Sequence, residues 1–423
     1  MRYFFRRPFY FLFILMLIIS FSITSIVKES NIKKDVILQG IIKEEFNGKY
    51  QHQYRIKNMF LKTNKKLVVG QYIEIQGIAE SLEFEDNSYH RYLKARAIDF
   101  EIKNPKIVLL EKRINIYGIG ESLRRKIGEF IDEGYRKESY FFRALFLGDT
   151  SSMDKDIYNT FKDSGTAHVI ALSGLHVGLL AGILEVLLFF FGKKSKSIII
   201  ICLMLLYSLI GGLRPSIIRA VIFLVMYYIC FFIRKPFDIL NSAGLIGIVY
   251  LLKNPWIIYD PGFVLSFFGV SSIGMYAWYF KKYLKYDVLV ITFAAQILIW
   301  PIIYYQFKMI SLVSLISNLL IVPIMSFCLF SFILTLGLEI IAPGSIMFSA
   351  SIPKMLFYLQ VEINKLFLSI PKSVLKFEKV SFIIFLFGMT FGLILGIYLE
   401  IKSIKENKYE IHRFYEKRQK ENE

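Results

Sequence analysis

The chain of 423 residues has little of what enzymes and disulfide-bonded secreted proteins use. Its three cysteines, Cys202, Cys230 and Cys328, all lie in apolar runs, which excludes a disulfide framework and favours buried thiols. Its five histidines form no paired metal motif, and no Gly-x-x-x-x-Gly-Lys-[Ser/Thr] phosphate loop occurs. We therefore expect no metal, no cofactor, no nucleotide-driven step and no enzymatic activity.

Acidic residues are scarce relative to basic ones. The 34 Asp and Glu stand against 52 Lys and Arg, a formal net charge of +18. Basic cytoplasmic loops and attraction to anionic lipid explain this excess most simply. A polyanionic substrate is the second explanation, and the total charge alone favours the first.

Apolar residues are abundant: 55% of the chain is hydrophobic and the mean hydropathy is +0.49. Several runs exceed the roughly 20 residues that cross a bilayer, so the sequence predicts a polytopic α-helical membrane protein. Residues 1–28, with Arg2, Arg6 and Arg7 before an apolar stretch, predict a first transmembrane helix that is retained, because no small-residue cleavage site follows.

Residues 33–112 change character and predict a soluble domain outside the membrane. Five runs of β-rich composition are separated by turn residues: 36–42, 50–59, 67–79, 93–102 and 106–110. Such a pattern indicates a small barrel, for which an OB-fold is the natural candidate. Tyr54, Arg55, Lys57 and Lys65 are candidates for binding single-stranded DNA in this OB-like domain, although an ordinary solvated surface explains them equally well.

Residues 113–165 predict amphipathic helices at the membrane surface, and residues 166–400 a multi-span domain. Basic residues gather in segments 193–196, 234–235 and 281–285 and in the tail 401–423. Two apolar segments separate each neighbouring pair, so all four fit on the cytoplasmic side, together with both termini. The candidate spans in this domain are 167–191, 198–210, 215–233, 237–252, 261–280, 287–306 and 380–399.

Residues 309–341 and 346–370 are ambiguous because Pro323 interrupts the first and Pro353 the second. Each is compatible with a full span, a re-entrant pair or a surface helix. The fold class that we expect is a polytopic membrane protein of about 8–10 spans carrying one small extracytoplasmic OB-like barrel.

The segment from Ser164 to Gly182 is the centre of the candidate site. Gly174, Gly178 and Gly182 recur every fourth residue, a spacing that favours close helix packing. Ser173 and His176 share the other face of the expected helix, and polar residues at membrane depth are functional candidates. A packing histidine is the simpler alternative for His176.

Other polar residues cluster where helices running from outside to inside begin. Together with the segment above they give a candidate substrate path: His168, Ser173, His176, Arg214, Arg219, Asp260, Ser266 and Asn318. Converging helix N-termini and two arginines would form an electropositive funnel for anions. For Arg219 two roles are open, contact with a phosphate and a brace with Asp260, and they do not exclude each other. Asp260 is also a natural helix cap.

Several motifs resemble the ComEC family of competence DNA-uptake channels. They are Ala144-Leu145-Phe146-Leu147-Gly148-Asp149, Ser173-Gly174-Leu175-His176-Val177, the segment Gly212–Ala220, Asp260–Phe267 and Asn318–Pro323, in the family's order. The resemblance covers nearly the whole chain and implies an OB-fold in the soluble insert. Many members carry a C-terminal metallo-β-lactamase-like domain, and here we expect a short form without it, which puts a nuclease role in doubt.

The resemblance implies a channel that passes single-stranded DNA into the cytoplasm across the plasma membrane of a bacterium. Its implied partners are single-stranded DNA, membrane lipid, a separate DNA receptor and a cytosolic ATPase or single-strand-binding protein, with a homo-oligomer left open. Two alternatives stand beside it. One is a transporter or flippase for a smaller phosphate-bearing anion. The other is an intramembrane hydrolase using Ser173 and His176, which would need Asp260 to orient the imidazole.

Overall fold

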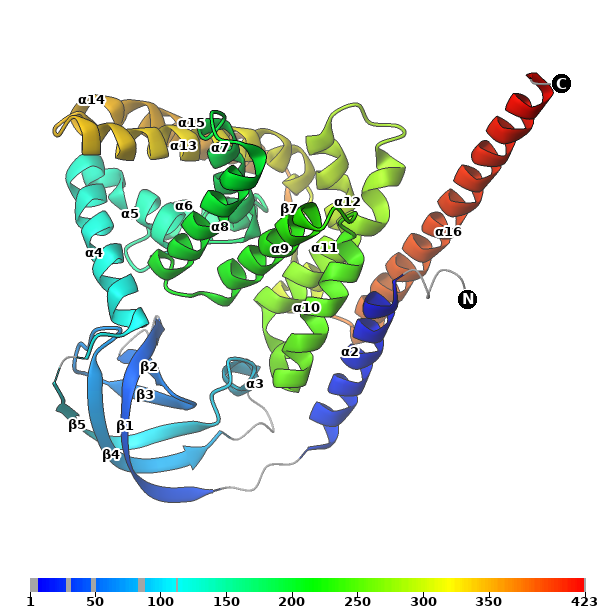
Figure 1. Ribbon diagram of the computed structural model, residues 1–423. Helices are drawn as coiled ribbons and strands as arrows, with labels where there is room; N and C mark the ends of the chain where they lie inside the picture. Colours follow the sequence, from blue (N-terminus) through cyan, green and yellow to red (C-terminus); the bar gives the residue numbers. More distant parts are fainter. Residues whose placement is uncertain (1–6, 28–31, 47–50, 83–87, 112, 422–423) are drawn as a thin grey trace.

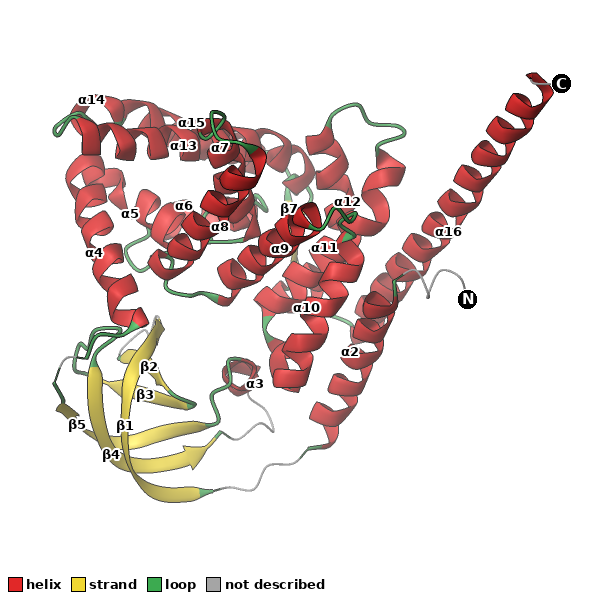
Figure 2. Ribbon diagram, viewed as in Figure 1, coloured by secondary structure: helices red, strands yellow, loops and turns green. Residues whose placement is uncertain are grey.

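A small β-barrel lies at one end of a large assembly of helices, and the C-terminal helix extends away from both (Figure 1). The computed structural model describes residues 7–27, 32–46, 51–82, 88–111 and 113–421, with side chains described up to residue 402. The predicted combination of apolar helices and one small barrel is confirmed (Figure 2). Arg2, Arg6 and the predicted strand start at residue 50 lie outside the described residues.

Five strands close the barrel in the order β1-β2-β3-β5-β4, with β1 pairing β4. Neighbours are antiparallel except β3 and β5, which are parallel. Inward-facing residues such as Ile42, Ile56 and Ile75 fill the interior, and closure leaves no free sheet edge. The strands are β1 (Lys33–Phe46), β2 (His52–Ile56), β3 (Met59–Thr63), β4 (Tyr72–Ser81) and β5 (Phe100–Leu109).

Two strand boundaries differ from the prediction. The expected strand 50–59 is instead β2 and the first residue of β3, because the chain turns at Lys57, whose φ is +53°. Leu93 lies in a helix, α3 (Ser88–Ala95), rather than in a strand. The two expected C-terminal strands are one, β5, since a bulge places Asn104 and Pro105 opposite a single residue, Gly77.

The helices form two packed groups. The first group contains α4, α5, α6, α7, α8, α9, α13, α14 and α15, and its core is rich in phenylalanine. The second contains α2, α10, α11, α12 and α16. Helix α9 touches both groups. The bounds in the first group are α4 (Ile116–Tyr135), α5 (Ser139–Phe142), α6 (Lys155–Asp163), α7 (Gly174–Leu187), α8 (Lys193–Ile210), α9 (Pro215–Phe232), α13 (Ser314–Ile341), α14 (Ile346–Ser349) and α15 (Ser351–Leu368).

The second group supplies most of the long apolar helices. Its bounds are α2 (Pro8–Ile26), α10 (Ile239–Lys253), α11 (Pro261–Phe280), α12 (Asp287–Phe307) and α16 (Phe382–Glu421). Six helices in the described residues are long and apolar enough to cross a membrane: α2, α9, α11, α12, α13 and the Phe382–Lys402 part of α16. Helices α7 and α10 are apolar but shorter. The chain is therefore a multi-pass membrane protein.

The predicted span 167–191 is not one helix. A short 3-10 turn, η3 (Ala167–Val169), precedes a bend, and α7 begins only at Gly174. Gly165 has a φ of +79°, and the hydroxyl groups of Ser164 and Thr166 bond to each other and to the carbonyl of Phe161. Such local bonds compete with a helix, which explains the late start.

Helix α13 runs through Pro323 without ending, which agrees with the full-span alternative for residues 309–341. A membrane helix tolerates the hydrogen bond lost at proline where its neighbours enclose it. One further expectation needs correction. Of the three thiols expected to be buried, only Cys328 is, while Cys202 is exposed and Cys230 is half-buried. An apolar run that faces lipid is exposed in the protein alone.

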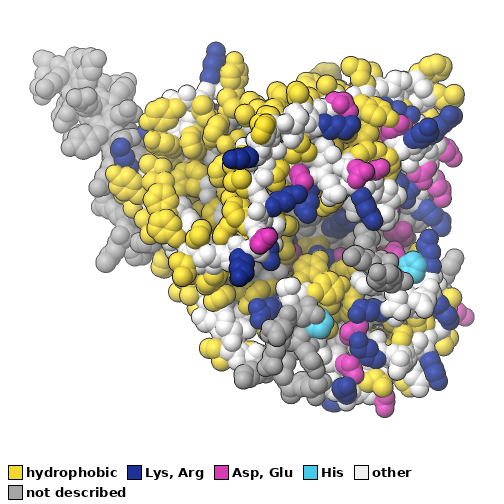
Figure 3. Space-filling model, turned by 180° about the vertical axis from the view of Figure 1, so that it is seen from behind, with side chains coloured by type: hydrophobic (Ala, Val, Ile, Leu, Met, Phe, Trp, Pro, Cys, Tyr) yellow, Lys and Arg dark blue, Asp and Glu magenta, His cyan; other side chains and the backbone are white. Residues whose placement is uncertain are grey.

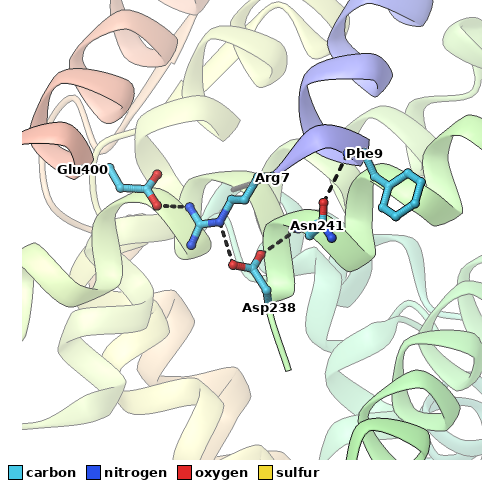
Figure 4. Close-up of polar contacts among 5 residues, drawn as sticks. All are labelled: Arg7, Phe9, Asp238, Asn241 and Glu400. Carbon is cyan, nitrogen blue, oxygen red and sulfur yellow. Dashed lines mark hydrogen bonds and ion pairs between the residues drawn. The ribbon is translucent and has the colours of Figure 1, made fainter. Parts of the chain in front are cut away.

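An ion-pair cluster joins three distant segments at the end of α2 that lies away from the barrel (Figure 4). The Arg7 Nε atom lies 2.6 Å from the Asp238 Oδ2 atom, and Arg7 also pairs with Glu400. Asp238 in turn accepts a hydrogen bond from the backbone N–H of Asn241 and so caps α10. The N-terminus, the α9–α10 loop and α16 therefore meet at one end of the helical assembly.

A candidate anion site between the barrel and two helix N-termini

The barrel is fastened to the helices through α3. This helix packs against η4 (Pro255–Tyr259), which leads directly into α11. The Asn254 side-chain amide donates to the carbonyl oxygens of Lys94 at 2.8 Å and Ala95 at 3.1 Å. These are the last two residues of α3, so Asn254 satisfies carbonyl groups that the helix end leaves free. The barrel is thereby held beside the N-terminus of α11.

Arg219 is the most deeply buried arginine at this junction, with 1% of its surface exposed. Its Nη1 atom lies 4.0 Å from the Oδ2 atom of Asp260, while its Nε and Nη1 atoms have no hydrogen-bond partner in the described residues. Asp260 uses its Oδ1 atom to accept from the backbone N–H of Gly262 at 2.9 Å, so it caps α11. Arg219 therefore has a facing charge but unused donors.

Arg214 precedes α9 and is half-buried. Its guanidinium lies so close to Gly148 that a Cβ atom there would be 2.7 Å from the Arg214 Nη1 atom. Gly148 also has a φ of +68°, a conformation that glycine adopts without strain. Burial, followed by the nearby charge of Arg124, lowers the pKa of Arg214 to about 10. The segment before Asp149 thus forms a wall of the site.

Four residues of this junction were missed by the sequence reasoning: Glu44, Tyr92, Arg96 and Arg124. Arg96, just after α3, pairs with Glu44 of β1, and its buried Nε atom has no hydrogen-bond partner in the described residues. The charges of Arg96 and Glu44 both act on Arg214, one lowering and the other raising its pKa. Two barrel residues therefore share an electrostatic environment with the start of α9.

Tyr92 and Arg124 complete the junction. The pKa of Tyr92 is raised chiefly by burial, and the charges of Arg96, Asp260, Glu44 and Arg214 all act on it. A Cβ atom at Gly212 would lie 3.0 Å from the Arg124 Nη1 atom, so α4 contributes an arginine from a third direction. Basic and acidic side chains are interspersed between the helices and the barrel (Figure 3). No spacing in the sequence predicts that these side chains come together, because their proximity depends on how α3 packs against η4.

Ser173 and His176 are brought together, but as a helix cap. The Ser173 hydroxyl accepts from the Leu175 N–H at 3.3 Å, and the His176 Nδ1 atom lies 3.4 Å from the backbone nitrogen of Ser173. His176 is fully buried and its Nε2 atom has no hydrogen-bond partner in the described residues. Asp260 contacts Gly262 and Arg219 instead, so no Ser-His-Asp arrangement is assembled in this part of the chain.

Ser216 was not among the predicted path residues, but its hydroxyl donates to the carbonyl of Leu172 at 2.8 Å and ties the start of α9 to the bend before α7. The remaining predicted path residues are His168, Ser266 and Asn318. His168 is exposed in η3, outside α7, and Ser266 is half-buried in α11. Asn318 is buried in α13, with an Oδ1 atom that has no hydrogen-bond partner among the described residues.

Asn318 sits beside a second polar cluster rather than at the junction. Its neighbour Ser317 donates to the Asn364 Oδ1 atom at 2.9 Å, and Thr166 donates to the same oxygen at 3.3 Å. This cluster joins α13, α15 and the segment before η3. It links those elements through hydrogen bonds and carries no ionised group of its own.

The predicted glycine packing is only partly present. A Cβ atom at Gly174 would lie 3.6 Å from Ala220 of α9, so this glycine does face a helix. A Cβ atom at Gly178 or Gly182 would meet nothing within 4 Å. The expectation that these two glycines pack is therefore wrong within the described chain, because α7 turns that face outward.

The predicted DNA-binding residues of the barrel also separate. Tyr54 is fully buried, and its hydroxyl group bonds to both the carbonyl and the N–H of Leu67, so it cannot stack on a base. Arg55 is half-buried and donates to the carbonyl of Lys57, and burial lowers its pKa. Lys57 and Lys65 are exposed. Only the two lysines keep the free surface position that the prediction assumed.

We compared the chain with known protein families, curated proteins and solved structures. Residues 145–402 match the family described as Competence protein. ComE operon protein 3 of Bacillus subtilis (strain 168) is 29% identical over 49% of this chain and 27% of its own length. Recombination protein 2 of Haemophilus influenzae is 24% identical over 45% of this chain, and protein YcaI of Escherichia coli (strain K12) is 27% identical over 44%. Both of these alignments also cover 27% of the relative.

The aligned region thus spans about a quarter of the length of these curated relatives. No solved structure matches the chain. The matched residues include the start of α9, the start of α11 and the Gly148-Asp149 wall, which together make most of the junction. Since the match covers more than half of the sequence, the chain belongs to the Competence protein family.

Proposed function

We propose that this protein is a membrane channel that passes single-stranded DNA into the cytoplasm during natural transformation. The observation that carries the proposal is the junction of Arg214 and Arg219 with the N-termini of α9 and α11. Arg219 has buried donors without a hydrogen-bond partner in the described residues, and both arginines lie where helix N-termini place partial positive charge. A phosphodiester suits this arrangement.

The chemistry of the junction favours phosphate over other anions. A guanidinium presents parallel N–H groups that match two phosphate oxygens, and helix N-termini add backbone donors. None of these contacts reads a base, so a strand of any sequence would be accepted. Membership of the Competence protein family supports a role in DNA uptake.

The direction of transport is part of the proposal. We place both termini and the basic segments 193–196, 234–235 and 281–285 in the cytoplasm, with the barrel outside. The ion pairs of Arg7 with Asp238 and Glu400 support this, because they gather the N-terminus, the second basic segment and the start of the basic tail at one end. We propose a DNA receptor outside and an ATPase or single-strand-binding protein inside as partners that supply the driving force.

The test is uptake of labelled DNA by a deletion strain and by strains complemented with variants. Arg214→Gln should abolish uptake while the protein still reaches the membrane. Arg234→Gln, in the loop at the other end of α9, removes the same charge and should leave uptake intact. Normal uptake in the deletion strain, with an altered lipid composition, would instead favour transport of a smaller phosphate-bearing lipid.

A further inference from the structure

The barrel adds its own arginine to the candidate anion site. Arg96 has 11% of its side chain exposed, pairs with Glu44, and keeps a buried Nε–H with no hydrogen-bond partner in the described residues. Arg219, on the helical side, keeps two such atoms, Nε and Nη1. In both cases the facing carboxylate comes from the protein itself: Glu44 on one side of the junction and Asp260 on the other.

Charges of the barrel side and of the helical side act on one another. The charge of Arg96 lowers the pKa of Arg214, and the pKa of Tyr92 is affected by the charges of both Arg96 and Asp260. Arg124 and Arg55 add further positive charge from α4 and β2. The carboxylates Glu44, Asp149 and Asp260 lie among these arginines, so an incoming anion meets guanidinium groups that already face internal carboxylates.

We propose that Arg96 and Arg219 hold neighbouring phosphates of one strand, and that Glu44 and Asp260 occupy these arginines until the strand displaces them. This inference rests on the proposed function and extends it by making the barrel a direct part of the substrate site. The carboxylates keep the buried guanidinium groups paired when no strand is bound, since an unpaired buried charge is costly. They also compete with the incoming phosphate.

The competition gives an unusual expectation for Glu44. Replacing it with Gln removes the internal competitor, so a single strand should bind more tightly. Glu45, the next residue, is exposed and faces His52 at 3.5 Å, so Glu45→Gln makes the same charge change away from the junction. Arg125 serves as the control for Arg96, because it is exposed on α4 and Arg125→Gln removes the same charge.

The experiment measures binding of a labelled thymidine oligonucleotide of about 16 nucleotides to the full chain in zwitterionic lipid nanodiscs, over a range of salt. Arg96→Gln should weaken binding about tenfold and reduce the slope of log affinity against log salt by about 0.7, the loss of one phosphate contact on a single strand. Arg125→Gln should change neither. Glu44→Gln should tighten binding more than Glu45→Gln does.

Three outcomes would overturn the inference: equal effects of Arg96→Gln and Arg125→Gln, weaker binding in Glu44→Gln, or competition by inorganic phosphate that Arg96→Gln does not alter. Arg96→Lys keeps the charge and should recover part of the affinity, which guards against a folding defect. Measurements of DNA uptake distinguish failure of the proposed channel function from failure of the proposed barrel site. If deletion abolishes uptake but Arg96→Gln leaves it normal, the barrel site is refuted and the channel stands. If deletion leaves uptake normal, the channel is refuted while the binding results still judge the site.

Discussion

Arg219 and Asp260 come from different helix groups, and their facing atoms, Nη1 and Oδ2, are 4.0 Å apart without a hydrogen bond to the guanidinium. The other carboxylate oxygen of Asp260, Oδ1, accepts a hydrogen bond from the backbone N–H of Gly262 in the first turn of α11. An ion pair of this length braces two helices weakly, because a well-formed charged hydrogen bond is about 2.7–2.9 Å long. The remaining donors of Arg219 are what a phosphate would use.

The first prediction concerns Arg219. Arg219→Gln should abolish DNA uptake with normal membrane abundance, and Arg219→Lys should retain part of the uptake because it keeps the charge but loses the paired donors. Uptake and immunoblotted membrane protein are measured together. Low abundance in Arg219→Gln that is recovered by the charge-swapped pair Arg219→Asp with Asp260→Arg would show a brace instead.

The second prediction concerns the ion-pair cluster at Arg7. Arg7→Ala removes the ion pairs of Arg7 with Asp238 and Glu400, and thermal unfolding of the purified protein in detergent should show a free energy of unfolding lower by about 3 kcal/mol. Lys281→Ala is the control, since Lys281 and Asp287 pair with about 70% of each side chain exposed and should matter by under about 0.5 kcal/mol. Equal losses would refute a special role for Arg7.

The third prediction concerns orientation. With the three native cysteines replaced by alanine, Lys65→Cys in the barrel should react with a membrane-impermeant thiol reagent in intact cells, whereas Lys194→Cys should not. Both lysines are exposed in the structure, so accessibility reports the side of the membrane rather than burial. The reverse pattern would invert the topology.

The fourth prediction concerns Tyr54. Tyr54→Phe removes the bonds at 3.1 Å and 2.9 Å that link its hydroxyl group to Leu67, and should cost about 1–2 kcal/mol of stability. Oligonucleotide binding should stay unchanged, because the ring lies inside the barrel. Lys65→Gln, at an exposed position, should leave stability unchanged and flatten the salt dependence of binding. Weaker binding in Tyr54→Phe at full stability would return Tyr54 to the binding surface.

The fifth prediction concerns Gly148. Gly148→Ala places a methyl group 2.7 Å from Arg214 Nη1 in a backbone with positive φ, so it should both destabilise the protein by about 1–2 kcal/mol and displace Arg214. Uptake should fall more steeply than abundance. Gly178→Ala meets nothing within 4 Å and serves as the matched control.

The sequence predicts the individual helices and the barrel of this protein better than the tertiary contacts between them. Apolar length and β-rich runs are local signals, which is why the long helices and the barrel were found. The bend before α7 was missed because hydropathy does not register the positive φ of Gly165 or the hydroxyl bonds around Thr166. A buried strand residue such as Tyr54 likewise looks like a surface aromatic until the strand register is known.

In the candidate site, too, residues marked by local signals were predicted and residues brought in by tertiary packing were not. Arg214, Arg219 and Asp260 were found because helix starts are marked by proline and by capping residues. Glu44 and Arg96 were not, since their relevance arises from the docking of α3 on η4, through Asn254 more than 150 residues away. Contacts of that kind are set by tertiary packing and leave no periodic trace in the sequence.

The Arg7 cluster finally has a consequence in time. Its partners are 231 and 393 residues further along the chain. At about 5–20 residues per second, roughly 20–80 s separate synthesis of Arg7 from that of Glu400. When the first helix inserts into the membrane, Asp238 and Glu400 have not yet been synthesised, so Arg7 cannot form either ion pair. The pair with Glu400 forms only after the start of α16 has been made, and this cluster is therefore completed late in the maturation of the protein.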